Sequence, residues 1–160
     1  MSAGANLASV LDSAEATALA LVDLSGPRPT SYTYERLRER SAAVATGLRR
    51  HFRPGARVGI LCGNSARFLV TYFGALQAGC TVVPFNPRAG EEYIGHVCRD
   101  AALDVLFVDG SPPSGVPADL AVMDSDGPSF ERWCSGDAVP VEVRPDSPAL
   151  VLYTSGSTGR

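Results

Sequence analysis

Four short apolar runs, the first three separated by segments with helical patterning, constrain the fold of this 160-residue chain most strongly. The runs are residues 57–62 (RVGILC), 81–83, 104–108 (DVLFV) and 149–153, and apolar side chains dominate each of them. A strand with this pattern is buried on both faces, as in a parallel sheet that helices cover on both sides. Strands that alternate with helices of about 12 residues form β-α-β units. The sequence therefore predicts an α/β fold with a doubly wound, mostly parallel sheet.

The segments between these runs carry helical signals. Thr33 is a good N-cap because its hydroxyl can accept a backbone N–H, and Glu35 then faces the positive end of the helix dipole. Apolar side chains recur at helical spacing as far as Leu48. Further helices are expected after a cap at residues 64–65 and over residues 91–99. The other expected elements are a short helix over 7–16, a hairpin of strands 18–23 and 30–32, a strand over 120–123 and a helical turn over 130–134.

A loop of glycines and hydroxyls, residues 154–159 (TSGSTG), follows the last apolar run directly. Glycine tolerates positive φ, so successive backbone N–H groups can converge on one anion, and Ser and Thr hydroxyls add donors. Ligands of parallel sheets bind outside the carboxyl ends of the strands, where this loop begins. The alternative for such a composition is a flexible loop or linker. The candidate phosphate-binding residues are Thr154, Ser155, Gly156, Ser157, Thr158 and Gly159.

Together with two earlier blocks, this loop resembles a known family. Residues 153–159 (YTSGSTG) resemble the phosphate-binding signature of the adenylate-forming superfamily, which includes acyl-CoA synthetases, luciferases and the adenylation domains of peptide synthetases. Residues 33–37 (TYERL) and 76–87 (LQAGCTVVPFNP) resemble two further blocks of that superfamily, in the same order. The resemblance favours the acyl-CoA synthetase branch, because Asn86 stands where the peptide-synthetase branch usually carries Asp.

The resemblance implies a domain organisation. It makes residues 1–17 an N-terminal segment and residues 18–160 the N-terminal α/β subdomain, which ends in the loop at 153–160. The family pattern continues past this loop with Pro, Lys and Gly, and the nucleotide pocket, the metal-binding Glu and the acyl pocket follow later. We therefore expect the remainder of the enzyme to lie beyond Arg160, and we expect the chain alone to be inactive. No catalytic residue and no metal ligand is assigned.

The resemblance also implies a reaction. The whole enzyme would use ATP and Mg²⁺ to activate a carboxylic acid as acyl-AMP, with release of pyrophosphate. It would then transfer the acyl group to the thiol of CoA or of a carrier protein's phosphopantetheine, with CoA favoured. The loop would bind the phosphates with preorganised donors. Two alternatives stay open, a self-contained phosphate- or nucleotide-binding module and a non-catalytic structural fragment.

Composition excludes other classes of function. The net charge is −3 and no basic stripe is present, which argues against nucleic acid as a partner. No apolar run approaches the roughly 18 residues of a membrane span, and no basic, signal-like N-terminus is present. The four cysteines lie far apart without a CxxC pair, which indicates reduced thiols in a cytoplasmic protein rather than a metal site.

Several other chemically capable side chains are interpreted as structural. His51 is expected to be a surface cation at a helix end, His96 a structural residue and Trp133 a packing anchor. Cys62 ends a predicted strand but has no base nearby in the sequence, so we do not interpret it as a nucleophile. The secondary candidates for ligand contact, just after a strand end, are Asn86 and Arg88.

Overall fold

The apolar runs form a four-stranded parallel sheet in the computed structural model, which describes residues 6–125, 127–134, 141, 143–144 and 146–153. The strands are β3 (Arg57–Leu61), β4 (Thr81–Pro84), β5 (Val105–Val108) and β6 (Ala121–Asp124), in the spatial order β4-β3-β5-β6. Each neighbouring pair is parallel. The predicted α/β fold with a mostly parallel sheet is therefore confirmed.

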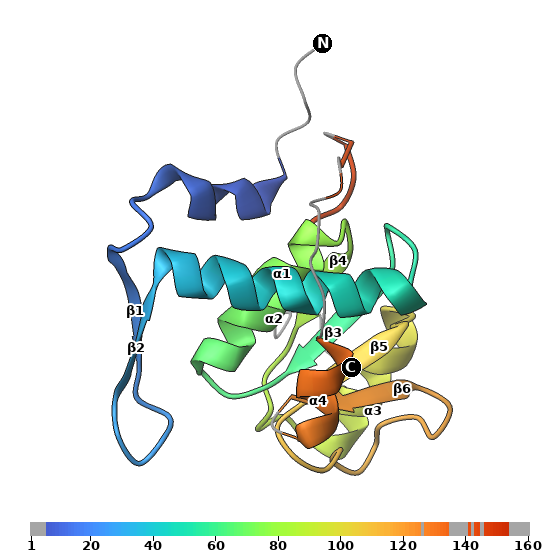
Figure 1. Ribbon diagram of the computed structural model, residues 1–160. Coiled ribbons are helices and arrows are strands. Elements are labelled where there is room, and N and C mark those ends of the chain that lie inside the picture. Colours follow the sequence, from blue (N-terminus) through green and yellow to red (C-terminus); the bar gives the residue numbers. More distant parts are fainter. Residues whose placement is uncertain (1–5, 126, 135–140, 142, 145, 154–160) are drawn as a thin grey trace.

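Helices cover both faces of this sheet, so it is doubly wound. The connection from β3 to β4 runs through α2 (Ala66–Gln77), and the connection from β4 back past β3 to β5 runs through α3 (Glu91–Asp100). Two crossovers of the same hand that run in opposite directions must place their helices on opposite faces. The remaining elements are η1 (Leu7–Ser13, a 3-10 helix), β1 (Leu19–Asp23), β2 (Thr30–Thr33), α1 (Tyr34–His51) and α4 (Pro128–Trp133) (Figure 1).

Alternate strand residues point into two separate hydrophobic clusters. Val58 and Ile60 of β3 belong to the cluster that α1 and α2 cover, whereas Leu61 belongs to the cluster under α3. In β5, Phe107 lies in the first cluster and Leu106 in the second. This alternation is the period of two that a pleated strand imposes, and here both sets of side chains are buried.

Helices α1 and α2 begin where side chains cap them. The Thr33 hydroxyl accepts a hydrogen bond from the Arg36 N–H at 3.2 Å, which confirms the predicted N-cap. Of the two candidates for the second cap, Ser65 is the one used, and it accepts from the Phe68 N–H at 3.4 Å. Helix α2 ends before Gly79, whose φ of +74° is a conformation that glycine adopts without strain.

The N-terminal elements pack onto these helices. Asn6 caps η1 through the Ala8 N–H at 2.9 Å, and its side-chain amide donates to the Leu76 carbonyl of α2 at 2.7 Å. Ala8 and Leu11 are buried in the first cluster. The predicted hairpin is confirmed as the antiparallel pair β1–β2, which lies to one side of the four-stranded sheet in Figure 1. No helix in the described part of the chain combines the length and the apolar character needed to cross a bilayer.

The prediction that residues 149–153 form a buried strand is wrong. The segment forms only a single parallel bridge, between Leu150 and Val82 of β4. Leu150 and Leu152 are 38% and 64% exposed. Val151 and Tyr153 do pack against the cluster under α3. The segment lies beside the outer edge of β4, so it is half covered, and its apolar composition alone did not reveal this.

Candidate functional site

The carboxyl ends of all four sheet strands meet at one edge, because the strands are parallel. The bridge between Leu150 and Val82 is also parallel, so residues 149–153 run toward the same edge. Two backbone hydrogen bonds of 2.9 Å fix this direction, from the Val82 N–H to the Ala149 carbonyl and from the Val151 N–H to the Val82 carbonyl. The six candidate residues that follow, Thr154 to Gly159, lie outside the described residues, so their phosphate-binding role stays a prediction.

Tyr153, the last described residue before the loop, is held by two side chains of α3. Its hydroxyl donates to Asp100 Oδ2 at 2.5 Å, and its ring meets the ring of His96 edge-on, with centroids 6.4 Å apart and planes at 89°. Burial, followed by the hydrogen bond and the negative charge of Asp100, raises the pKa of Tyr153 to about 12. The hydroxyl therefore stays protonated, and a donor, across the physiological pH range. His96 thus contacts the segment that leads into the candidate loop.

A second group of polar side chains lies where β3, β5 and β6 end. Asp109 Oδ2 accepts from the Gly63 N–H at 2.8 Å, and the Ser125 hydroxyl lies 2.8 Å from the Val108 carbonyl and 3.1 Å from Asp109 Oδ1. Asp124 Oδ1 accepts from the Gly110 N–H at 2.9 Å. These carboxylates bind backbone groups of neighbouring loops, so they brace the strand ends. These residues were not predicted from the sequence, although an acidic or hydroxyl residue just after an apolar run is a signal that marks such positions.

Cys62 contacts the same group of residues at the strand ends, and its environment does not activate it as a nucleophile. Its thiol donates to the Phe107 carbonyl at 3.6 Å, and its sulfur lies 3.5 Å from the Ser125 hydroxyl. Burial is the main reason that the pKa of Cys62 rises to about 12. A thiol that stays protonated at neutral pH is a poor nucleophile, which agrees with the structural interpretation made from the sequence.

Asn86 and Arg88, the secondary candidates, also follow a strand at this edge. Asn86 Oδ1 accepts from the Arg88 N–H at 2.8 Å, and the Asn86 carbonyl accepts from the Ala89 N–H at 3.0 Å. This is an Asx turn, which explains the choice of Asn at that position. Both residues are exposed at the edge, and ligand contact by either stays a prediction.

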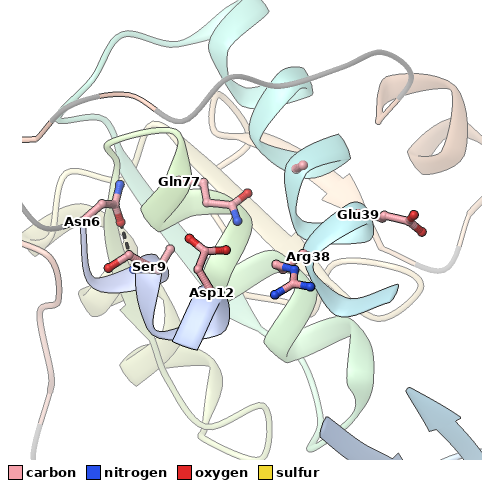
Figure 2. A pocket seen from close by; sticks show the side chains of 8 residues that line it. Asn6, Ser9, Asp12, Arg38, Glu39 and Gln77 are labelled. Carbon is pink, nitrogen blue, oxygen red and sulfur yellow. Dashed lines mark hydrogen bonds between the residues drawn. The ribbon is translucent and has the colours of Figure 1, made fainter. Parts of the chain in front are cut away.

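Two pockets lie along α2. A pocket of about 440 Å³ lies between β1 and the start of α2, where Asp23 Oδ2 accepts from the Ala66 N–H at 2.9 Å. A pocket of about 270 Å³ lies between η1, α1 and α2, and Figure 2 shows Asp12, Arg38 and Gln77 lining it. The Arg38 guanidinium donates to the Leu11 carbonyl at 3.0 Å, so its charged side chain is engaged in a hydrogen bond within the fold.

Clusters of side chains that could hold a metal ion were sought among the described residues. Among them, no three side chains of His, Cys, Asp or Glu lie close enough together to hold one.

Comparison with known proteins identifies the family. Residues 10–160 match the sequence model of the AMP-binding enzyme family. The chain is 38% identical over 133 residues to a feruloyl-CoA synthase of Amycolatopsis sp, a match that covers 82% of the chain and 27% of that protein. It is 31% identical over 139 residues to the fatty acid–[acyl-carrier-protein] ligase ScoC of Streptomyces coeruleorubidus, covering 79% and 26%.

A solved structure has the same fold. The structure of an ATP-bound RpMatB–BxBclM chimera superimposes on this chain with a TM-score of 0.82 and 27% identity, covering 98% of the chain and 33% of the chimera. The chain thus spans about a quarter of the length of the two curated relatives and a third of the solved one. It is therefore a member of the AMP-binding enzyme family, the adenylate-forming superfamily that its sequence blocks resemble, and corresponds to the N-terminal portion of such enzymes.

Proposed function

We propose that this chain is the N-terminal α/β subdomain of an ATP-dependent acid–thiol ligase, with residues 1–17 as an N-terminal segment and residues 18–160 as the subdomain. The observation that carries this proposal is the direction of residues 149–153. They run parallel to β4 toward the carboxyl edge of the sheet, and the Gly/Ser/Thr loop follows them in the sequence. Ligands of open parallel sheets bind outside this edge. The relatives' activities support the same class of reaction.

In this proposal, residues 154–159 bind the phosphates of ATP. Backbone N–H groups of residues 155–159 and the hydroxyls of Thr154, Ser155, Ser157 and Thr158 supply donors for the charge that builds on the β- and γ-phosphates as the acid's carboxylate attacks the α-phosphorus. Preorganised donors also orient the triphosphate for in-line attack. Mg²⁺ bound with the nucleotide would neutralise further charge on the departing pyrophosphate. The solved chimera that shares this fold is ATP-bound, which supports ATP as the nucleotide.

The second half of the proposed reaction transfers the acyl group from acyl-AMP to a thiol. One relative is a CoA synthase and the other is an acyl-carrier-protein ligase, so both acceptor classes occur among the relatives. Asn86 favours CoA, by its resemblance to the acyl-CoA synthetase branch. We place the reaction in the cytoplasm, which is supported by four free, buried cysteines.

The test is ATP–pyrophosphate exchange by the intact protein that carries this chain, across a panel of fatty, aromatic and amino acids. The double variant Thr154→Ala/Ser155→Ala should lower exchange at least about tenfold with its best acid, because it removes two donors to developing charge. The matched control is Ser13→Ala/Thr17→Ala, which removes two exposed hydroxyls outside the loop and should leave exchange unchanged.

Two outcomes would contradict the ligase proposal. Equal exchange by the loop variant and the wild type would remove the loop from the reaction. Tight pyrophosphate binding without exchange for any acid would instead favour a self-contained phosphate-binding module. Calorimetric titration of the protein with pyrophosphate measures this binding directly and so distinguishes a phosphate-binding module from a protein whose loop binds no phosphate.

A further inference from the structure

The path of the chain into the candidate loop is fixed in two stages. The backbone hydrogen bonds described between this segment and β4 end at Val151, whose N–H donates to the Val82 carbonyl. Leu152, the next residue, is largely exposed. Between Val151 and the loop, Tyr153 makes the described contacts to the rest of the fold, and these are made by its side chain.

Tyr153 is anchored on one face of α3. His96 and Asp100 are four residues apart and so share a helix face. The rings of Tyr153 and His96 pack edge to face. The Tyr153 hydroxyl donates to the carboxylate of Asp100, the last residue of the helix. A hydrogen bond to an ionised carboxylate is stronger than one between neutral groups.

Helix α3, which carries both of these side chains, is packed firmly against the sheet. Ile94 and Val97 of α3 are 2% and 0% exposed and pack into the cluster under the sheet. The Ala101 N–H continues the helix by donating to the Val97 carbonyl at 2.9 Å. The Arg57 guanidinium also donates to the Ala101 carbonyl, at 2.6 Å, and this bond ties the end of α3 to the start of β3. The contact with Asp100 therefore links Tyr153, through the end of α3, to β3, an inner strand of the sheet.

We propose that Tyr153 is a positioning residue, whose hydrogen bond to Asp100 fixes the point at which the phosphate-binding loop leaves the sheet. This inference rests on the proposed function of residues 154–159. Placement of the loop matters because its donors act only where they meet the phosphates within hydrogen-bond distance. Loss of this hydrogen bond weakens the binding of the nucleotide and leaves the binding of the acid unchanged.

Conservative variants in the intact protein test the proposal. Tyr153→Phe removes the hydroxyl and keeps the ring beside His96, and Asp100→Ala removes the acceptor. Both should raise the KM for ATP in the exchange assay roughly fivefold, the effect of losing one charge-assisted hydrogen bond, with the KM for the acid unchanged. Asp100→Asn keeps an acceptor oxygen and should restore a KM for ATP within about twofold of wild type. The matched control is Tyr72→Phe on α2, which should change neither KM.

A double variant and a stability measurement separate positioning from a merely structural role. Tyr153→Phe/Asp100→Ala should be no worse than either single variant, because both remove the same bond. The thermal midpoints of Tyr153→Phe and Asp100→Ala should stay within about 2 °C of wild type, since the bond lies at the surface. An unchanged KM for ATP in both single variants, or additive effects in the double variant, would overturn the inference.

The loop variant Thr154→Ala/Ser155→Ala, assayed in parallel, distinguishes this inference from the proposed function. If that variant raises the KM for ATP and Tyr153→Phe does not, the positioning role fails and the phosphate-binding loop stands. If neither variant affects ATP, the loop assignment itself fails.

Discussion

Gly74 of α2 lies so close to Val44 of α1 that a Cβ atom on Gly74 would come within 2.6 Å of the Val44 Cβ. The same atom would lie 2.7 Å from the Ser41 carbonyl oxygen, a backbone atom that cannot rotate away. The contact between the two helices that cover the first cluster therefore depends on the absence of a side chain at this position.

Gly74→Ala should destabilise the fold by about 1–3 kcal/mol, the usual cost of overpacking a well-packed interior. The measurement is the free energy of unfolding in urea. Gly26→Ala is the control, because the nearest atom that a Cβ would meet there is 3.7 Å away. Equal stability of the Gly74→Ala variant and wild type would mean that α1 and α2 can separate without cost.

Thr71→Val should stabilise the protein by about 1 kcal/mol. The Thr71 hydroxyl is fully buried and has no hydrogen-bond partner among the described residues. Burial of a hydroxyl without a partner costs free energy, and valine has nearly the same shape. The control is Thr46→Val on α1, where the hydroxyl donates to the Ala42 carbonyl at 3.0 Å and its loss should bring no gain. A destabilised Thr71→Val variant would imply a partner that this hydroxyl does bind.

The cysteines should resist alkylation in the folded protein. All four are free and buried, and burial is the main cause that raises the pKa of Cys62 and of Cys80 to about 12. Iodoacetamide at pH 8, followed by mass spectrometry, should label them only after denaturation. Rapid labelling of Cys62 in the native protein would contradict the buried brace at the strand ends.

The same pKa shifts set a pH dependence of stability. A thiol whose pKa rises on folding stabilises the fold fully below its unfolded pKa, near 9, and this stabilisation is lost as the pH rises toward about 12. Urea midpoints should therefore fall between pH 9 and pH 11. A Cys80→Ala variant should lose less over that interval than wild type, because one of the groups with a raised pKa is gone.

Asp23 should contribute to stability at neutral pH and lose that contribution in acid. Hydrogen bonds from Ser25, side chain and then backbone, and from the Ala66 N–H hold the pKa of Asp23 below its usual value of 3.8. A lowered pKa stabilises the fold above the unfolded pKa, and the effect disappears as the pH falls through the folded pKa. Asp23→Ala should cost about 1 kcal/mol at pH 7 and progressively less below pH 4. The exposed Asp119→Ala variant serves as the control, and a pH-independent cost at Asp23 would refute the linkage.

The sheet and its helices could be predicted from the sequence because their signals are local. Continuous apolar runs identified β3 and β5, and Thr33 marked the start of α1 through a hydroxyl that accepts from a backbone N–H three residues later. The burial of residues 149–153 could not be predicted, because an apolar run does not reveal how many neighbours it has. The order β4-β3-β5-β6 likewise depends on pairings between distant segments.

The surroundings of the candidate site were beyond local patterns. Tyr153 and Asp100 are 53 residues apart, and nothing in either segment alone pairs them. Asp109 and Ser125 come together only because β5 and β6 end at the same edge. The phosphate-binding role proposed for residues 154–159 rests on their composition, on their resemblance to the family signature and on the direction of the chain that leads into them. These residues themselves lie outside the described part of the structure.

The segregation of the two hydrophobic clusters by the sheet has an energetic consequence. Val44 lies in the cluster on one face of the sheet and Ile94 in the cluster on the other face. A cavity made by truncating Val44 and a cavity made by truncating Ile94 therefore have different neighbouring side chains. Truncations in different clusters should therefore sum in their effects on stability, whereas truncations within one cluster should interact. The two layers can accordingly diverge in sequence independently, each under its own packing constraint.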